Sequence, residues 1–203
     1  EPLGALDKKL REETQFELID IQMELGITFV IVTHDQEEAM TMSDRIGVMD
    51  QGRLVQVATP GEIYEQPNSK YVADFIGDIN IFEGRVADIG ANKMSIVTKD
   101  ETRLSVESSE AVTLNQTVWL AVRPEKMRVS LDPPADGTSN LRQGAVFDIG
   151  YLGDWTNYLV DLAPSGRRIR ASQANMSRFV ERPITWDDKV YLHFAPDAGV
   201  VLK

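Results

Sequence analysis

The sequence predicts an α/β segment followed by an all-β segment that contains an internal duplication. Three observations support this prediction. A helix-forming stretch near the start of the chain leads into a continuous run of apolar, β-branched residues. Helical periodicity then ends near Asp78, after which alternating strand patterns dominate. Finally, two short sequence patterns each recur within residues 78–203.

The first helix is expected over residues 8–25. Asp7 suits its N-cap, apolar residues recur at helical spacing, and Gly26 suits its C-cap. Residues 27–32 are continuously apolar, which is typical of a strand buried on both faces. A helix followed by a buried strand is half of an α/β unit.

Shorter elements are expected from there to Gly77. Their signals are acidic residues in a first turn, β-branched runs around a glycine turn, a proline at a helix start and a serine cap. The expected elements are a helix at 36–42, strands at 45–49 and 53–58 joined by a turn at 50–52, and helices at 60–64 and 70–76. These residues form the first of two predicted domains, 1–77 and 78–203.

The second domain carries the duplication. The pattern Gly-x-Val-x-Asp-Ile-Gly occurs at 84–90 and again at 144–150, 60 residues later. Residues 118–124 are matched by 190–196, 72 residues later, so we expect about a dozen inserted residues within 173–184. The copies span about 80–130 and 141–203, and each should begin and end with a strand. Two five-stranded, OB-like barrels fit this arrangement, and a β-sandwich is the alternative.

Composition excludes several functions. The net charge of −11 argues against nucleic-acid binding, which depends on clustered Lys and Arg. The charge is uneven, because residues 1–77 carry 15 acidic and 6 basic residues and residues 78–203 carry 17 and 15. The chain has no cysteine and only two histidines, far apart in sequence, so we expect no metal site. No apolar run approaches the ~20 residues of a membrane-spanning helix.

His34 is the polar residue of greatest interest. It follows the predicted buried strand, at the edge where open α/β sheets place their ligands. A neutral imidazole there could donate to a phosphate or orient a water, although a strand-end histidine bonded to nearby backbone remains the alternative. On residue type alone Asp7 is a helix cap, and Glu1 is a lone carboxylate. Residues 47–52 have the glycine spacing of a phosphate-binding loop, but a strand–turn–strand context and the lack of a Lys-Ser/Thr pair exclude it.

Two further groups of side chains in the second domain are candidate binding residues. Its aromatic residues Trp119, Trp155, Tyr158 and Trp186 could stack bases, but the acidic charge favours core packing. Arg167, Arg168 and Arg170 form its one basic cluster. That cluster would serve the alternative function, a stand-alone regulatory or ligand-binding OB-like module, unless it merely marks an exposed hairpin.

Several stretches of the chain resemble the ATPase subunits of ABC transporters. Residues 1–11 resemble the stretch after the second nucleotide-binding strand, and Val32-Thr33-His34-Asp35 begins a match to the switch-histidine motif. Residues 44–49, 52–56 and 59–64 continue the resemblance, and 122–125 look like an element of the accessory domain in importers for maltose, sulfate and polyamines. Residues 63–65, 75–77, 80–84 and 151–154 look closest to putrescine importer ATPases.

The resemblance implies roles for particular residues. Glu1 matches the glutamate that polarises the attacking water, and His34 matches the histidine that contacts the terminal phosphate of ATP. Gly4, Ala5, Leu6 and Asp7 match a loop that faces the partner subunit. The fold implied is an α/β remnant of a nucleotide-binding domain followed by an OB-like accessory domain.

The resemblance also implies cofactors and partners. The intact subunit would bind ATP and Mg and form a homodimer. It would act with membrane permease subunits and a substrate-binding protein on the cytoplasmic face of the inner membrane, in the uptake of putrescine or spermidine.

The phosphate-binding lysine loop, the magnesium aspartate and the signature sequence of this family would precede Glu1. We therefore expect the chain alone to bind no cofactor and to be inactive as an ATPase. A strand at residues 27–33 would also lack parallel neighbours from that region. We expect residues 1–77 to be covered by another copy or to be poorly ordered.

Overall fold

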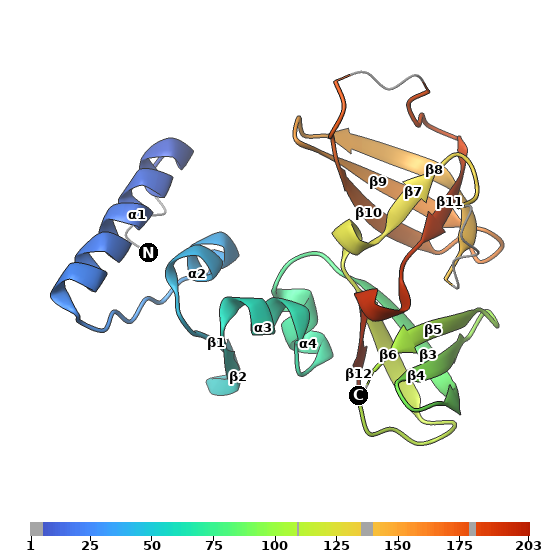
Figure 1. Ribbon diagram of the computed structural model, residues 1–203, viewed down its shortest axis with the longest axis horizontal. Coiled ribbons are helices and arrows are strands. Elements are labelled where there is room, and N and C mark those ends of the chain that lie inside the picture. Colours follow the sequence, from blue (N-terminus) through green and yellow to red (C-terminus); the bar gives the residue numbers. More distant parts are fainter. Residues whose placement is uncertain (1–5, 109, 135–139, 179–181) are drawn as a thin grey trace. The chain divides into compact units, whose positions relative to one another are not determined.

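The computed structural model describes residues 6–108, 110–134, 140–178 and 182–203. The chain divides into two compact units, Glu1–Gly77 and Asp78–Lys203 (Figure 1). None of the helices in the described residues has the length and apolar character needed to cross a membrane.

The first unit begins with helix α1 (Lys8–Leu25), whose predicted caps are confirmed. The Asp7 carboxylate accepts a hydrogen bond from the Leu10 amide at 3.1 Å, and Gly26 adopts the left-handed conformation with φ of 61°. The remaining elements of the first unit are α2 (Gln36–Met42), β1 (Ile46–Asp50), β2 (Arg53–Ala58), α3 (Pro60–Glu65) and α4 (Lys70–Phe75).

A small core holds the shorter elements of this unit together. It consists of buried residues from β1, α3 and α4 and the residue after α4, namely Ile46, Val48, Ile63, Val72 and Ile76. The β1–β2 hairpin turns through Gln51 and Gly52, with φ of 46° and 78°, which are the positive values that a tight hairpin turn requires. Of α1, by contrast, only Gln15 is buried.

The predicted buried strand at residues 27–32 is wrong for this chain. The segment forms no strand, and all six of its residues are exposed, with Val30 at 87% and Val32 at 83%. An apolar strand is buried only if other strands or helices cover both of its faces. No element of residues 6–77 covers this segment. Residues 27–32 therefore form no buried strand in this chain, although their sequence is typical of one.

The second unit is all-β, as predicted. One sheet has the order β12-β6-β3-β4-β5 and the other the order β10-β9-β8-β11-β7, both antiparallel. The first sheet contains β3 (Asn80–Ile89), β4 (Lys93–Thr98), β5 (Arg103–Glu107), β6 (Thr117–Val122) and β12 (Gly199–Leu202). The second contains β7 (Arg128–Ser130), β8 (Arg142–Tyr151), β9 (Trp155–Leu162), β10 (Arg168–Ala174) and β11 (Lys189–His193).

The two copies exchange their last strands. After β6 and the short 3₁₀ helix η1 (Pro124–Lys126), the first copy continues into β7, which pairs with β11 of the second copy. After β11 and η2 (Pro196–Ala198), the second copy continues into β12, which pairs with β6 of the first. Each sheet curls so that its end strands meet, β5 with β12 and β10 with β7 (Figure 1). This curling agrees with OB-like barrels more than with a sandwich.

The repeated sequence pattern has a structural cause. A Cβ atom on Gly84 would lie 2.5 Å from Ile96, and one on Gly144 would lie 2.6 Å from Val160, so close strand approach requires glycine at both positions. Three residues further on, both strands carry a β-bulge, between Val86 and Asp88 in β3 and at the matching residues of β8.

Reciprocal side-chain bonds join the copies. Asn140 is fully buried, and its amide both donates to and accepts from the backbone of Ser105 at 2.8 Å. Asn80, 60 residues earlier, makes the same pair of bonds with the backbone of Arg170, at 2.7 and 2.9 Å. Each copy thereby supplies a buried amide to an edge strand of the other.

The core of the second unit is duplicated. Val86, Ile96 and Val118 in the first copy match Val146, Val160 and Val190 in the second, and none of the six is more than 1% exposed. The prediction that the tryptophans pack in the core is wrong for Trp155 and Trp186, which are 40% and 61% exposed. Both lie outside the inward-facing alternation, at a strand start and in a turn.

Candidate functional site

In the first unit, Arg11 brings together the two segments that carry the predicted site residues. One nitrogen of its guanidinium donates to the backbone carbonyl of Leu6 at 3.2 Å. Another lies 3.3 Å from the Asp35 carboxylate, and both side chains of this ion pair are about 30% exposed. The stretch at Leu6 and Asp7 and the turn that carries His34 are therefore held close to one another. Glu1, Gly4 and Ala5 lie outside the described residues.

The turn that carries His34 is fixed on its other side by hydrogen bonds. The Thr33 hydroxyl donates to the buried carboxylate of Glu38 at 2.8 Å and accepts from the Asp35 amide at 2.9 Å. Asp35 also caps α2, accepting from the amide of Glu37 at 2.9 Å. His34 itself is exposed. The turn is thus rigidly bonded on both sides of an imidazole that solvent and ligands can reach.

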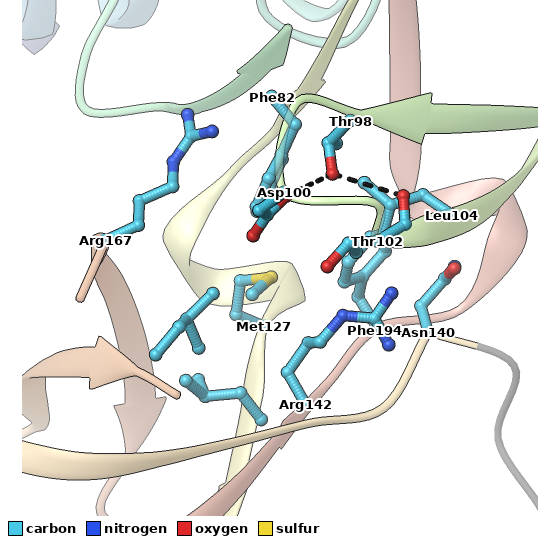
Figure 2. A pocket seen from close by; sticks show the side chains of 12 residues that line it. Phe82, Thr98, Asp100, Thr102, Leu104, Met127, Asn140, Arg142, Arg167 and Phe194 are labelled. Atoms are coloured by element: carbon cyan, nitrogen blue, oxygen red, sulfur yellow. Dashed lines mark hydrogen bonds between the residues drawn. The ribbon is translucent and has the colours of Figure 1, made fainter. Parts of the chain in front are cut away.

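The second unit contains a small, partly open cavity between the two copies, shown in Figure 2. Its volume is about 20 Å³, room for about one water. Asp100 lies in its wall, and a hydrogen bond from the Thr98 hydroxyl holds the pKa of its carboxyl below the ordinary value. This cavity is too small for a substrate and serves as part of the joint between the copies.

Two arginines line the same cavity, and each is bonded to a different backbone carbonyl (Figure 2). Arg142 donates to the backbone carbonyl of Arg103 at 2.7 Å, and Arg167 donates to the carbonyl of Ile81 and lies 4.7 Å over the Phe82 ring. Burial lowers the pKa of both guanidinium groups.

The predicted basic cluster is not a single site. Arg167 has the partners just described, Arg168 forms a two-bond ion pair with Asp161 at 2.8 and 3.0 Å, and Arg170 pairs with Asp78. Because each arginine is neutralised or bonded separately, the cluster offers no shared anion site. The described residues also contain no group of three or more side chains arranged to hold a metal ion.

Sequence reasoning missed Arg11, Asn80 and Asn140. The two asparagines had a signal, since they stand 60 residues apart like the repeated glycines. Arg11 had none, because its importance depends on Asp35, which lies 24 residues away and joins it only in the folded chain.

Comparison with known proteins gives consistent results. A family model for the TOBE domain matches residues 120–202. The putrescine transport ATP-binding protein PotG of Escherichia coli K12 is 44% identical over 203 residues, which are 100% of this chain and 53% of that protein. A spermidine/putrescine import ATP-binding protein of Trichormus variabilis is 48% identical over 177 residues, 86% of this chain and 46% of the relative. The chain thus spans about half the length of the curated relatives it matches.

Among solved structures, the cytoplasmic molybdate-binding protein ModG is similar with a TM-score of 0.53 and 15% identity. The match covers 60% of this chain and 94% of that one. At this identity the likeness concerns the fold alone.

Proposed function

The chain is homologous to the ATP-binding subunits of ABC-type polyamine importers, and on this premise we propose that it acts as the C-terminal part of such an ATP-hydrolysing subunit. The intact subunit would energise uptake of putrescine or spermidine. The observation that carries the proposal is the 44% identity to PotG across the whole of this chain.

Residues 1–77 would be the C-terminal portion of a nucleotide-binding domain, and residues 78–203 an accessory domain. In that setting His34 would contact the terminal phosphate of ATP, and Glu1 would polarise the attacking water. Arg11 supports this proposal, because it bonds both the Leu6 carbonyl and Asp35, the residue after His34. It thereby keeps the segment at Leu6 close to the turn that carries His34. Phosphoryl transfer depends mainly on positioning and charge stabilisation, which a turn bonded on both sides can supply.

Residues 4–7 would form the loop facing a second copy in a homodimer. The intact subunit would hold ATP with Mg. It would dock on membrane permease subunits, with a substrate-binding protein, at the cytoplasmic face of the inner membrane. The chain alone is expected to bind ATP with no appreciable affinity, because its sequence contains no phosphate-binding lysine loop.

A chimera tests the proposal directly. These 203 residues would replace the matching part of E. coli PotG, assembled with that protein's own transport partners, and ATP hydrolysis would be measured. We expect an active chimera, and we expect His34→Ala to lower its rate roughly 100-fold, as loss of one transition-state contact does.

His193→Ala is the matched control, since that histidine lies in β11 of the accessory domain. It should leave the rate within a few-fold of the unsubstituted chimera. A folded chimera without activity, or equal losses for both histidines, would contradict the proposal and favour the alternative of a stand-alone ligand-binding module.

A further inference from the structure

Two side chains tie the turn that carries His34 to distant parts of the first unit. Arg11 of α1 lies 24 residues before Asp35 and donates to its carboxylate at 3.3 Å. Gln36, the first residue of α2, donates from its side-chain amide to the backbone carbonyl of Phe75, 39 residues later at the end of α4. The two residues that follow His34 are thus each bonded to a different helix.

The start of α2 does not need these two bonds. Its N-cap is complete without them, because the other oxygen of the Asp35 carboxylate accepts from the amides of Glu37 and Glu38 at 2.9 and 3.3 Å. Helix α3 begins with an equally complete cap at Thr59, whose cap bonds are made with Glu62, three residues away. The distant bonds of α2 therefore fix where the helix begins in space, and the local bonds form the helix.

Arg11 differs from the other basic residues of α1. Lys8 and Lys9 each pair with a glutamate four residues later, at 3.9 and 4.0 Å, and both lysine side chains are 87% exposed. Exposed pairs of this kind contribute little to stability. The Arg11 side chain is 29% exposed, and its guanidinium bonds the Leu6 carbonyl at 3.2 Å as well as Asp35. Arg11 therefore joins separate parts of the fold, whereas the two lysines remain on the surface.

We propose that Arg11 and Gln36 are positioning residues, which hold His34 where it contacts the terminal phosphate of ATP. This inference rests on the proposed function, in which His34 makes that contact. Arg11 would act through the Asp35 carboxylate, and Gln36 through the first turn of α2. A displacement of about 1 Å can lower a rate on the order of 100-fold, so loss of either bond should slow hydrolysis. The phosphate-binding loop of the intact subunit would still hold ATP, so KM should not change.

The test uses the chimera with PotG. Arg11→Ala and Gln36→Ala should each lower kcat for ATP hydrolysis roughly 10-fold and leave KM for ATP unchanged. Arg11→Lys keeps a charge opposite Asp35 and should recover part of the loss, although a lysine does not reproduce the fork of a guanidinium.

Two matched controls remove similar groups elsewhere in the first unit. Lys9→Ala removes a positive charge from the same helix as Arg11. Gln56→Ala removes an amide that donates to the Gln66 carbonyl at the end of α3, at 3.0 Å, much as Gln36 does at the end of α4. Both controls should leave kcat and KM unchanged.

Combination with His34→Ala separates positioning from a general structural role. If Arg11 and Gln36 act through His34, then adding Arg11→Ala or Gln36→Ala to His34→Ala should lower the rate no further, because the contact they support is already lost. In the 203-residue chain, hydrogen exchange at the Asp35 amide, which donates to the Thr33 hydroxyl at 2.9 Å, should be faster in both single variants and unchanged in both controls.

The possible failures are distinguishable. Further losses in the double variants, equal losses from a variant and its control, or unchanged exchange at Asp35 would overturn the inference and leave the proposed function standing. A folded, unsubstituted chimera that does not hydrolyse ATP would overturn the proposed function, and the inference with it.

Discussion

Residues 27–32 and strand β3 show how differently two apolar, strand-like stretches can end up in one chain. Val30 is 87% exposed and unpaired, whereas Val86 of β3 is fully buried. β3 has strands on both sides, β4 and β6, and residues 27–32 have none in the part of the chain that the structure describes. An apolar, strand-like sequence therefore forms a buried strand only where other strands are available to pair with it.

In the second unit, the pairing strands come from within the unit itself. Its two copies close each other's sheets by exchanging β7 and β12, and they bond each other's edge strands through Asn80 and Asn140. The first unit has no such device for residues 27–32. If this comparison is correct, substitutions at the joints of the second unit should be costly, and substitutions in residues 27–32 should not.

The largest effect is expected from Gly144→Val. A Cβ there would lie 2.6 Å from the Val160 side chain and 2.7 Å from the Asp161 carbonyl oxygen, so β8 and β9 would have to separate. We expect the free energy of unfolding of the second unit to fall by about 3 kcal/mol. Urea unfolding followed by tryptophan fluorescence measures it, because all three tryptophans lie in this unit.

Gly150→Ala is the control, since its Cβ would meet nothing closer than 3.9 Å. It should change stability by less than about 0.5 kcal/mol. Equal losses from the two substitutions would mean that close strand approach is not what the repeated glycine provides.

Asn140→Ala is expected to come next. The substitution removes both partners of the partly buried backbone N–H and C=O of Ser105, at a cost of about 2 kcal/mol. Asn80→Ala should cost a similar amount, because Asn80 makes the matching bonds to Arg170. Asn92→Ala, at an exposed position, should be neutral. The same urea titration checks all three, and a large cost for only one of the two buried asparagines would break their equivalence.

Local elements could be predicted from the sequence because their signals are local. The Asp7 cap, the Gly26 cap, the hairpin around Gln51 and Gly52, and the duplicated glycine pattern all appear as expected. The caps depend on residues within one turn of the helix. The duplication is visible because the same steric requirement recurs at Gly84 and Gly144.

Long-range features could not be predicted in the same way. No short sequence pattern marks β7 as a partner of β11, since the exchange depends on how two copies pack. Residues 27–32 carry a correct strand pattern but no pairing partners. At the candidate site, the strand pattern placed His34 at the end of a buried strand that this chain does not form, and His34 lies instead in an exposed turn before α2. Its link to Leu6 through Arg11 required the fold.

A smaller effect is expected from pH at the exchanged strand β7. His193 of β11 stands opposite Arg128 of β7, whereas the equivalent pair in the other sheet, Ala121 and Val200, carries no charge. Burial, together with the charge of Arg128, lowers the pKa of His193 below its ordinary value of 6.5. The unfolded chain then binds a proton more readily than the folded chain, so stability present above pH 6.5 is lost as the pH falls below it.

Urea midpoints at pH 7.5 and pH 5.5 would measure this loss. His193→Gln should make the difference between the two midpoints smaller, and His34→Gln in the first unit should leave it unchanged. An unchanged difference in His193→Gln would mean that protonation of His193 is not what destabilises the second unit between these two pH values. Asp100 would not account for such a difference, because its lowered pKa makes its contribution fall only below about pH 4.

The smallest effect on stability is expected from Val30→Ser. Because Val30 is 87% exposed, the substitution should change the unfolding free energy of this chain by less than about 0.5 kcal/mol. In the chimera with PotG, partner strands would be available to cover the segment, and the same substitution should cost about 2 kcal/mol through loss of a buried valine. Light scattering should also show less self-association of the serine variant, since an uncovered apolar segment favours association. A loss of stability in the 203-residue chain as large as that of Val86→Ser would mean that residues 27–32 are already covered, and the contrast between the two stretches would fail.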